Sequence, residues 1–359
     1  MSDILKKIDD VAKQLKESIE NLQKPEIQYP IRSLNNVYFD KKNGYFAISD
    51  KMSTRHLSAN TAKQFAQMIH MMNLIKELIK SKDIATKRDV YYQSKNWDKI
   101  KFEEQPESDK IMDDLEAMLQ TVREQMGFIP DEHGGGVVGN LKITDVNPVT
   151  NRQVVIDCAN FGSGAYTIPP GVEKLKLQST AKFVLAIETA GMFQRLVSHG
   201  FWNQHNCILI SMGGVPSRAC RRFTRRLSDE LKLPIYVFTD GDPYGYTNIY
   251  RTLKVGSGNS AHINKYFCVP KAQFIGVTPD DIVKYNLPTH KLKDVDITRA
   301  RQALKNDPFI LAHKPWQNAL QKIISMGVRC EQQALSAHGL NYVIDTYLPE
   351  KFKARTFLP

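Results

Sequence analysis

Three short apolar runs decide the fold of this sequence: residues 183–187 read FVLAI, residues 207–210 read CILI and residues 235–238 read IYVF. Runs of this length and composition are typical of strands that are buried on both faces. The segments between them, 192–199 and 217–231, carry apolar residues at helical spacing. Because strands that alternate with helices pair in parallel through right-handed crossovers, this order predicts an α/β domain with a parallel sheet.

Acidic residues follow two of these predicted strands. Glu188 comes directly after the first strand, and Asp240 and Asp242 follow the third in a Thr-Asp-Gly-Asp turn. The carboxyl ends of parallel strands meet at one edge of the sheet, where ligands bind in open α/β folds. Carboxylates gathered there suit Mg²⁺, which prefers oxygen ligands. Each acid taken alone also fits a plain turn, because Asp-Gly is a turn former.

Five arginines share one face of the predicted helix that precedes the third strand. They follow the spacing i, i+3, i+4, i+7 and i+8, and they are Arg218, Arg221, Arg222, Arg225 and Arg226. Like charges at these offsets repel one another, so a bound anion is expected to compensate them. We interpret the face as a contact for a nucleic-acid phosphate backbone, with an ion-paired surface as the alternative.

The first half of the chain predicts three helices and a short β segment. Apolar residues at helical spacing mark helices over 65–79 and 108–126, and Thr86 is a suitable N-cap for a short helix between them. The strand-like run 137–146, after three glycines, predicts a small β wing. This order is the layout of a winged-helix (CAP-like) domain that binds DNA, although any three-helix unit shows a similar pattern.

The short helix carries the segment Arg88-Asp89-Val90-Tyr91-Tyr92. Arg88 and Tyr92 are four residues apart and therefore share a helix face. A guanidinium one turn from a phenol can hold a phosphate group beside a tyrosine nucleophile. The alternative is a pair of tyrosines packed in the core.

The N-terminal segment 3–22 carries an apolar stripe at helical spacing, which predicts an amphipathic helix. The helix either packs on its own protein or docks a partner subunit. After it, Asn43-Gly44 between two strand-like runs predicts a hairpin.

Composition limits the function without deciding it. The 359 residues carry 49 Lys and Arg against 38 Asp and Glu, a net charge of +11, and 42% are hydrophobic. This chain length and hydrophobic fraction are enough for two to three packed domains, and the excess of basic residues permits a polyanion partner. No run approaches the roughly 18 apolar residues of a membrane span. Five cysteines without a CxxC pair indicate a reducing compartment.

Several motifs taken together resemble those of a known family. They are the segment 88–92, Glu188, the turn Asp240-Gly241-Asp242-Pro243-Tyr244-Gly245, and the segments 329–335 (RCEQQAL) and 347–351 (YLPEK). They resemble the DNA-cleaving component of the type IIB topoisomerases, the archaeal topoisomerase VI family, which is related to the nuclease that makes meiotic double-strand breaks. The resemblance extends from about residue 60 to the end of the sequence.

The resemblance implies a role for each motif residue. Tyr92 matches the nucleophile that forms a reversible 5′-phosphotyrosyl link with DNA, and Arg88 matches the arginine of the same catalytic motif. Glu188, Asp240 and Asp242 match the acidic triad of the Toprim domain, which binds Mg²⁺.

The resemblance also implies an assembly. It is a homodimer of this subunit on double-stranded DNA, joined by a GHKL-type ATPase B subunit in an A2B2 heterotetramer, and ATP binds to that partner. The expected division is a partner-docking extension (1–59), a winged-helix domain (60–147), a linker and strand region (148–180) and a Toprim domain with a C-terminal elaboration (181–359). We expect a cytoplasmic, nucleoid-associated isomerase without a membrane partner. The alternatives are a Toprim-type metal-dependent DNA nuclease or break-forming protein without strand passage, and a non-enzymatic DNA-binding scaffold.

Overall fold

The computed structural model describes residues 3–130 and 134–359. The chain forms two compact units. The N-terminal unit contains Met1–Asp40, Phe46–Asp131 and Ser257–Tyr266, and the C-terminal unit contains Lys41–Tyr45, Glu132–Gly256 and Phe267–Pro359. A short segment from the second half of the sequence therefore belongs to the first unit.

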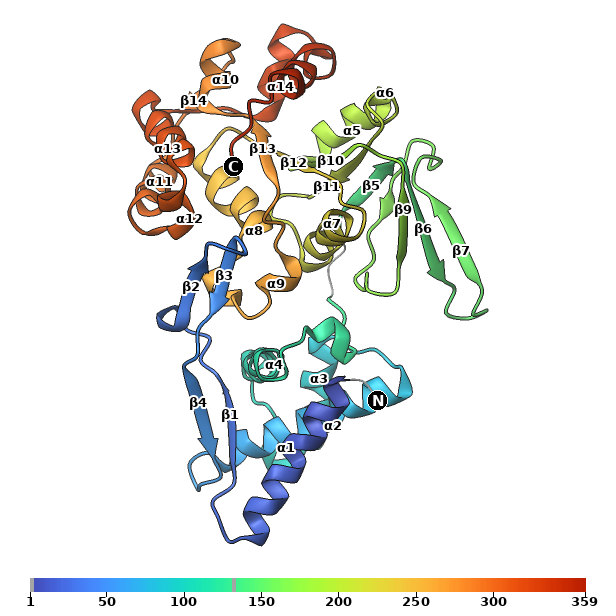
Figure 1. Ribbon diagram of the computed structural model, residues 1–359, viewed down its shortest axis with the longest axis vertical. Coiled ribbons are helices and arrows are strands. Elements are labelled where there is room, and N and C mark those ends of the chain that lie inside the picture. The colour runs from blue at the N-terminus through green and yellow to red at the C-terminus, as the bar shows by residue number, and fades with distance from the viewer. Residues whose placement is uncertain (1–2, 131–133) are drawn as a thin grey trace. The chain divides into compact units, whose positions relative to one another are not determined.

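The N-terminal unit is mainly helical (Figure 1). Its helices are α1 (Asp3–Glu20), α2 (Ala62–Ser81), α3 (Lys87–Gln93) and α4 (Gln105–Leu119), and its strands are β1 (Glu26–Pro30), β2 (Val37–Asp40), β3 (Tyr45–Ile48) and β4 (Met52–His56). Strand β1 pairs antiparallel with β4, and β2 pairs with β3. The predicted hairpin is confirmed, and Gly44 in its turn has a φ of +75°, which favours glycine. The last predicted helix is shorter than expected, because α4 ends at Leu119 and a separate 3-10 helix spans Arg123–Met126.

The N-terminal helix α1 packs on the chain itself. Ile4, Ile8 and Leu15 are buried in one core with residues of α2 and α4. Ile19 and Leu22, at and just beyond the end of the helix, are 60% and 96% exposed. The apolar stripe is therefore mostly used inside the unit, and the apolar surface left for a partner is confined to this end.

The predicted β wing is wrong. Strand β5 (Gly136–Gly139) pairs antiparallel with β11 (Cys207–Ser211) in the sheet of the C-terminal unit. A Cβ on Gly139 would lie 2.3 Å from the carbonyl oxygen of Cys207, so glycine allows this close approach. The pattern of the run 137–146 indicates a strand but does not reveal its partner.

The region that the sequence predicts as linker and strand belongs to a small sheet. Strand β6 (Leu141–Val146) lies between β7 (Gln153–Asp157) and β9 (Lys176–Ser179) in a three-stranded antiparallel sheet, which is green in Figure 1. A short strand, β8 (Tyr166–Thr167), pairs with β5. This region is therefore a structured part of the C-terminal unit.

The main sheet of the C-terminal unit confirms the predicted α/β fold. Its six strands have the order β13-β12-β10-β11-β5-β8. Strand β10 (Phe183–Ile187) lies parallel between β11 and β12 (Ile235–Phe238), and β12 is parallel to β13 (Gln273–Gly276). The crossovers contain α5 (Ala190–Ser198), α6 (Phe201–Gln204) and α7 (Arg218–Glu230). Ala186 and Ile187 of β10 and Phe238 of β12 are fully buried, as expected for central strands.

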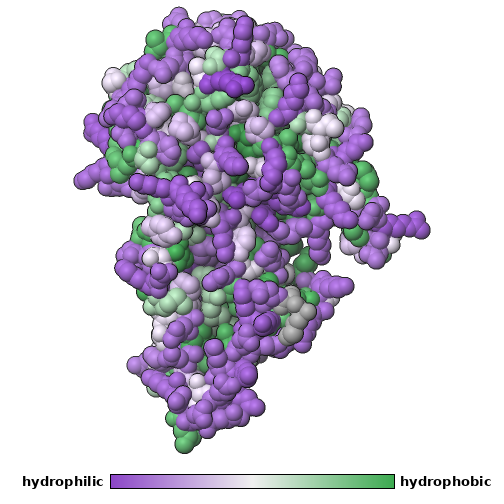
Figure 2. All heavy atoms as spheres, in the orientation of Figure 1, coloured by the Kyte–Doolittle hydropathy of each residue, from purple (hydrophilic) through white to green (hydrophobic). Residues whose placement is uncertain are grey.

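Further short elements complete the chain. They are α8 (Arg251–Lys254), α9 (Asn264–Phe267), α10 (Pro279–Lys284), α11 (Asp294–Asn306), α12 (Pro308–Ala312), α13 (Lys314–Met326), α14 (Leu348–Ala354), β14 (His290–Lys291) and β15 (Val328–Arg329). Hydrophilic residues dominate the face of the molecule in Figure 2. None of the described helices is both long and apolar enough to span a membrane.

Candidate active site

The parallel register brings the predicted acids together at one edge of the main sheet. Glu188 follows the last residue of β10, which is aligned with the last residue of β12, and Asp240 lies two residues after that strand. The backbone N–H of Asp240 donates to Glu188 Oε2 at 2.9 Å. The sheet topology therefore places these two residues side by side, as the sequence order predicts.

The turn that carries Asp240 and Asp242 is fixed from both sides. Gly241 and Cys330 exchange two backbone hydrogen bonds, of 2.7 and 3.1 Å. The N–H of Gln332 donates to Asp240 Oδ1 at 2.9 Å, and the N–H of Gly245 donates to Asp242 Oδ1 at 2.6 Å. The segment 329–335 thus holds the acidic turn in place. Its presence among the family motifs signalled a role, but composition and spacing gave no indication of this contact.

Burial makes the carboxylates of this acidic centre hard to ionise. Loss of hydration, followed by repulsion from Asp240 and Asp242, raises the pKa of Glu188 to about 8. Burial also raises the pKa of Asp240 to about 6, and burial raises that of Asp242. A divalent cation would offset both effects, and a set of three carboxylates supplies the oxygen ligands that a hard cation prefers. The chemistry of the three residues therefore fits a divalent metal, although their ligand atoms do not all lie within 4.8 Å of one another in this structure.

Two polar side chains beside the acidic centre have unused hydrogen-bonding groups. Thr189 donates to Gln332 Oε1 at 2.9 Å, whereas Gln332 Nε2 is buried and has no hydrogen-bond partner within residues 3–130 and 134–359. The Nε of Arg329 is likewise buried and has no hydrogen-bond partner among those residues. The positive charge of Arg329 lowers the pKa values of Asp240 and Asp242. Donors of this kind suit phosphate or metal-bound water.

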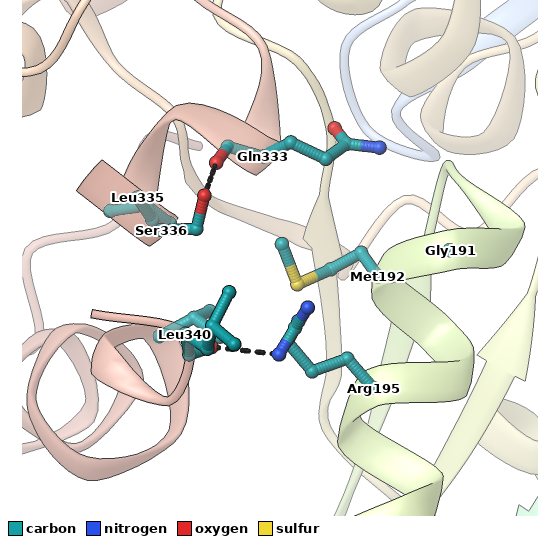
Figure 3. Close-up of a pocket in the computed structure, with 8 residues that line it drawn as sticks. Gly191, Met192, Arg195, Gln333, Leu335, Ser336 and Leu340 are labelled. Carbon is teal, nitrogen blue, oxygen red and sulfur yellow. Dashed lines mark hydrogen bonds between the residues drawn. The ribbon is translucent and has the colours of Figure 1, made fainter. Parts of the chain in front are cut away.

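A pocket of about 150 Å³ is lined by residues that follow Glu188 and Gln332 closely in the sequence (Figure 3). Helix α5 contributes Gly191, Met192 and Arg195, and the facing wall is formed by Gln333, Leu335, Ser336, Leu340 and Val343. Arg195 donates to the carbonyl oxygen of Leu340 at 3.0 Å. None of the three acids Glu188, Asp240 and Asp242 is among the residues that line this pocket.

The tyrosine motif lies in the N-terminal unit on a well-capped helix. Thr86 Oγ1 accepts a hydrogen bond from the N–H of Asp89, and the Asp89 carboxylate accepts one from the N–H of Thr86. This reciprocal capping box fixes the start of α3, as Thr86 predicts. Val90 on the opposite side is buried and anchors the helix, so Arg88 and Tyr92 are exposed.

The two tyrosines of the motif have different surroundings. The Tyr91 hydroxyl donates to the carbonyl oxygen of Glu103 at 3.0 Å, and the Lys95 ammonium lies 4.1 Å from the centre of its ring. Tyr92 is 60% exposed, and its hydroxyl makes no hydrogen bond to any described residue. Tyr91 is therefore held by a hydrogen bond within its unit, whereas Tyr92 is exposed.

The five arginines of α7 do not form the open basic face that the helical spacing predicts. Arg221 and Arg226 are only 6% and 7% exposed. Arg226 donates to the carbonyl oxygens of Val172 and Leu175 and pairs with Glu230. These two side chains are consequently internal structural groups, because the face of α7 that carries them packs against the chain.

The other three arginines of α7 also have partners within the C-terminal unit. Arg222 pairs with Glu173, Arg225 pairs with Asp229, and the Arg218 guanidinium lies 4.6 Å from the ring centre of Phe267. The alternative of an ion-paired surface thus describes most of this face.

Models of known protein families match three parts of the chain. The family model for the Toprim domain that topoisomerase 6 shares with Spo11 matches residues 183–352, which identifies a Toprim domain. A second family model, described as "Type IIB DNA topoisomerase", matches residues 63–128. A third, described as "All-beta domain in DNA topoisomerase VI alpha subunit", matches residues 131–181. The last match covers the region of β5 to β9, where the sequence predicts a wing followed by linker and strand.

Relatives match over nearly the whole chain. The A subunit of type 2 DNA topoisomerase 6 from Methanocaldococcus jannaschii is 51% identical over 98% of this chain and 95% of its own length. Proteins of the same name from Archaeoglobus fulgidus and Methanothermobacter thermautotrophicus are 39% and 35% identical, each over 92% of this chain and 91% of their own length. The chain belongs to the family of topoisomerase VI A subunits.

Proposed function

We propose that this chain is the DNA-cleaving subunit of an ATP-dependent type IIB topoisomerase, which opens a transient double-strand break and passes a second duplex through it. Family membership over 98% of the chain supports the reaction type. The acidic centre of the Toprim domain and the exposed tyrosine of the N-terminal unit supply the two kinds of group that the reaction needs.

The nucleophile in this proposal is Tyr92. Its hydroxyl oxygen attacks a DNA phosphorus atom, the bond between phosphorus and the 3′ oxygen breaks, and the 3′ oxygen leaves as a hydroxyl, so one proton passes from tyrosine to the leaving group. The 5′-phosphotyrosyl ester that forms retains the bond energy for religation. The observation that carries this assignment is the free, exposed hydroxyl of Tyr92 beside the hydrogen-bonded hydroxyl of Tyr91.

Arg88 serves this tyrosine by binding the phosphate. It is exposed one helical turn before Tyr92 on α3, so both side chains address a ligand on the same side of the helix. A guanidinium can donate two parallel hydrogen bonds to a phosphate and offset the negative charge that grows on its oxygens.

The Toprim carboxylates Glu188, Asp240 and Asp242 would hold Mg²⁺. When bound, this ion stabilises the negative charge of the reacting phosphate and of the leaving oxygen. The N–H groups of Gln332 and Gly245 keep two of the carboxylates at the edge of the sheet. Arg329, close to the same acids, adds a positive charge for the DNA backbone.

The assembly in this proposal is an A2B2 heterotetramer on double-stranded DNA, in the cytoplasm with the nucleoid. Two copies of this chain hold the two broken ends, and a GHKL-type ATPase B subunit supplies ATP hydrolysis. The exposed apolar residues Ile19 and Leu22 are the proposed contact for that subunit. Of the α7 arginines, Arg218, Arg222 and Arg225 remain partly accessible for DNA.

The test compares Tyr92→Phe with Tyr91→Phe in the assembled enzyme. Each is incubated with supercoiled plasmid and stopped with denaturant, and protein linked to 5′ ends is then measured. We expect Tyr92→Phe to abolish both the covalent adduct and ATP-dependent relaxation, because phenylalanine has no nucleophilic oxygen. Tyr91→Phe keeps the free hydroxyl and should still form the adduct.

Cleavage by Tyr92→Phe without protein-linked ends would overturn the proposal and favour a Toprim nuclease that uses water. Asp240→Ala provides a second check, since loss of a metal ligand should abolish cleavage while duplex binding persists.

A further inference from the structure

A second group of potential metal ligands lies in the N-terminal unit. Within residues 3–130 and 134–359, it is the one group of three His, Cys, Asp or Glu residues whose ligand atoms all lie within 4.8 Å of one another, and it consists of Asp113, Glu116 and His262. All three belong to the N-terminal unit, whereas the Toprim carboxylates belong to the C-terminal unit. None of the three is used by the proposed cleavage reaction.

Two chain segments build this group. Asp113 and Glu116 are three residues apart on α4 and so share one helix face. His262 comes from the segment Ser257–Tyr266, which leaves the C-terminal unit and joins the N-terminal one. The Tyr266 hydroxyl donates to the carbonyl oxygen of Gln120 at 2.7 Å, which ties the same segment to the end of α4.

The imidazole of His262 is the observation that points to a ligand. Its side chain is only 5% exposed, and both ring nitrogens are buried without a hydrogen-bond partner among the described residues. The Nε2 atom lies 3.7 Å from Oε2 of Glu116, which is itself fully buried. Buried polar groups are normally paired, because an unpaired one loses its hydration without compensation. The imidazole thus faces a buried carboxylate at a distance that a shared cation would bridge.

In this structure the guanidinium of Arg123 supplies the positive charge between the carboxylates of Asp113 and Glu116. Arg123 Nη2 lies 2.7 Å from Asp113 Oδ1 and 2.8 Å from Glu116 Oε2, and Arg32 lies 3.3 Å from Asp113. The Arg123 backbone N–H also donates to Glu116 Oε1 at 2.7 Å, so this carboxylate stays oriented even when the guanidinium moves. A metal cation that replaces Arg123 Nη2 would also bind the imidazole, whose nitrogens the guanidinium leaves unsatisfied.

We propose that Asp113, Glu116 and His262 form a second metal site, which takes a zinc-type divalent cation and fastens the segment Ser257–Tyr266 to α4. One imidazole nitrogen and two carboxylate oxygens are ligands of Zn²⁺, with water as the fourth, whereas Mg²⁺ prefers oxygen alone. The site is structural, and it is independent of the proposed cleavage reaction.

The test measures metal binding by the full chain after chelation and dialysis. Zn²⁺ is titrated in the presence of excess Mg²⁺, which occupies the Toprim carboxylates, and bound metal is counted after gel filtration. We expect one equivalent of Zn²⁺ and a higher Tm. His262→Ala should weaken this binding at least about tenfold, the lower end of what even an outer-shell change costs. Co²⁺ in place of Zn²⁺ should give visible absorption bands of low-coordinate cobalt that His262→Ala removes.

Matched variants separate a site from a loss of folding. The Asp113 side chain is partly exposed, so Asp113→Asn should leave the fold intact. This variant should lose the zinc equivalent while keeping the circular dichroism of the metal-free protein. His205→Ala, a histidine elsewhere in the C-terminal unit, and Asp240→Ala should both retain it. Equal zinc binding by His262→Ala and the wild type, or the absence of a stoichiometric zinc equivalent, would overturn the proposal. The guanidinium of Arg123 would then be the permanent cation of this cluster.

Discussion

Single residues of the acidic centre show how burial and function are coupled. Glu188 and Asp240 are held close by a backbone hydrogen bond and lose much of their hydration, so their pKa values rise to about 8 and about 6. A protonated carboxyl group is a poor metal ligand, and metal binding must therefore release protons. The groups proposed to hold the ion would thus make its binding depend on pH.

We expect the affinity for Mg²⁺ to rise with pH. Below about pH 8 Glu188 must lose a proton to bind, so the affinity should increase by about tenfold per pH unit between pH 6 and 8 and level off above. Calorimetry in buffers of different ionisation enthalpy would count the protons released. A flat affinity over this range, or the same profile in Glu188→Gln, would contradict the assignment.

Secondary-structure elements decide which charged residues face solvent. On α7 the spacing of five arginines is that of one face, but the tertiary neighbours of the helix cover part of it. Helix α3 shows the opposite case, since a local capping box and one buried valine present its polar side outward. A helical face alone therefore predicts proximity among side chains but not their exposure.

Replacement of Arg226 should affect folding and leave DNA binding unchanged. Arg226→Gln leaves the carbonyl oxygens of Val172 and Leu175 without their donor, at a cost of about 1–3 kcal/mol for each unpaired group. Urea unfolding should show this loss. The salt dependence of duplex binding, followed by fluorescence anisotropy, should keep its slope. A slope that flattens by about 0.9 would instead show that Arg226 contacts phosphate.

Removal of the cap of α3 should weaken cleavage more than stability. Thr86→Ala deletes one acceptor and costs about 1 kcal/mol. Because the cap fixes the start of the helix that carries Tyr92, we expect less covalent adduct at equal protein folding. Thr86→Ser retains the hydroxyl and serves as the control. Equal adduct formation by the alanine and serine variants would show that the cap does not position the tyrosine.

For the whole molecule, the division into units separates the two kinds of chemical group. Arg88 and Tyr92 belong to the N-terminal unit, and the Toprim carboxylates belong to the C-terminal unit. The segment Ser257–Tyr266 comes from the second half of the sequence but belongs to the N-terminal unit. Deletion of α1 would open the core that contains Ile4 and Leu15, so point substitutions are the better probe of docking.

We expect Ile19→Lys together with Leu22→Lys to weaken co-purification with the ATPase partner. Both side chains are exposed, so Tm should change little while apolar contact with the partner is lost. Val149→Lys, at a 91% exposed valine of the C-terminal unit, is the matched control. Unchanged co-purification of the double variant would remove this end of α1 from the interface.

Features that depend on neighbours along the chain can be predicted from the residue pattern. The apolar runs of β10, β11 and β12 predict buried parallel strands, Thr86 predicts the cap of α3, and the acids after two strands predict a common edge. Each follows from local periodicity, capping chemistry or strand order. The motif segments also indicate the family, because they are recognisable from the residues alone.

Features that depend on partners distant in sequence could not be predicted and emerge from the folded structure. It showed that β5 joins the main sheet instead of a wing, that Arg221 and Arg226 are buried, and that His262 lies against two carboxylates of α4. The periodicity of a strand or helix specifies which side chains share a face, but the partner of that face is set by packing across the whole unit.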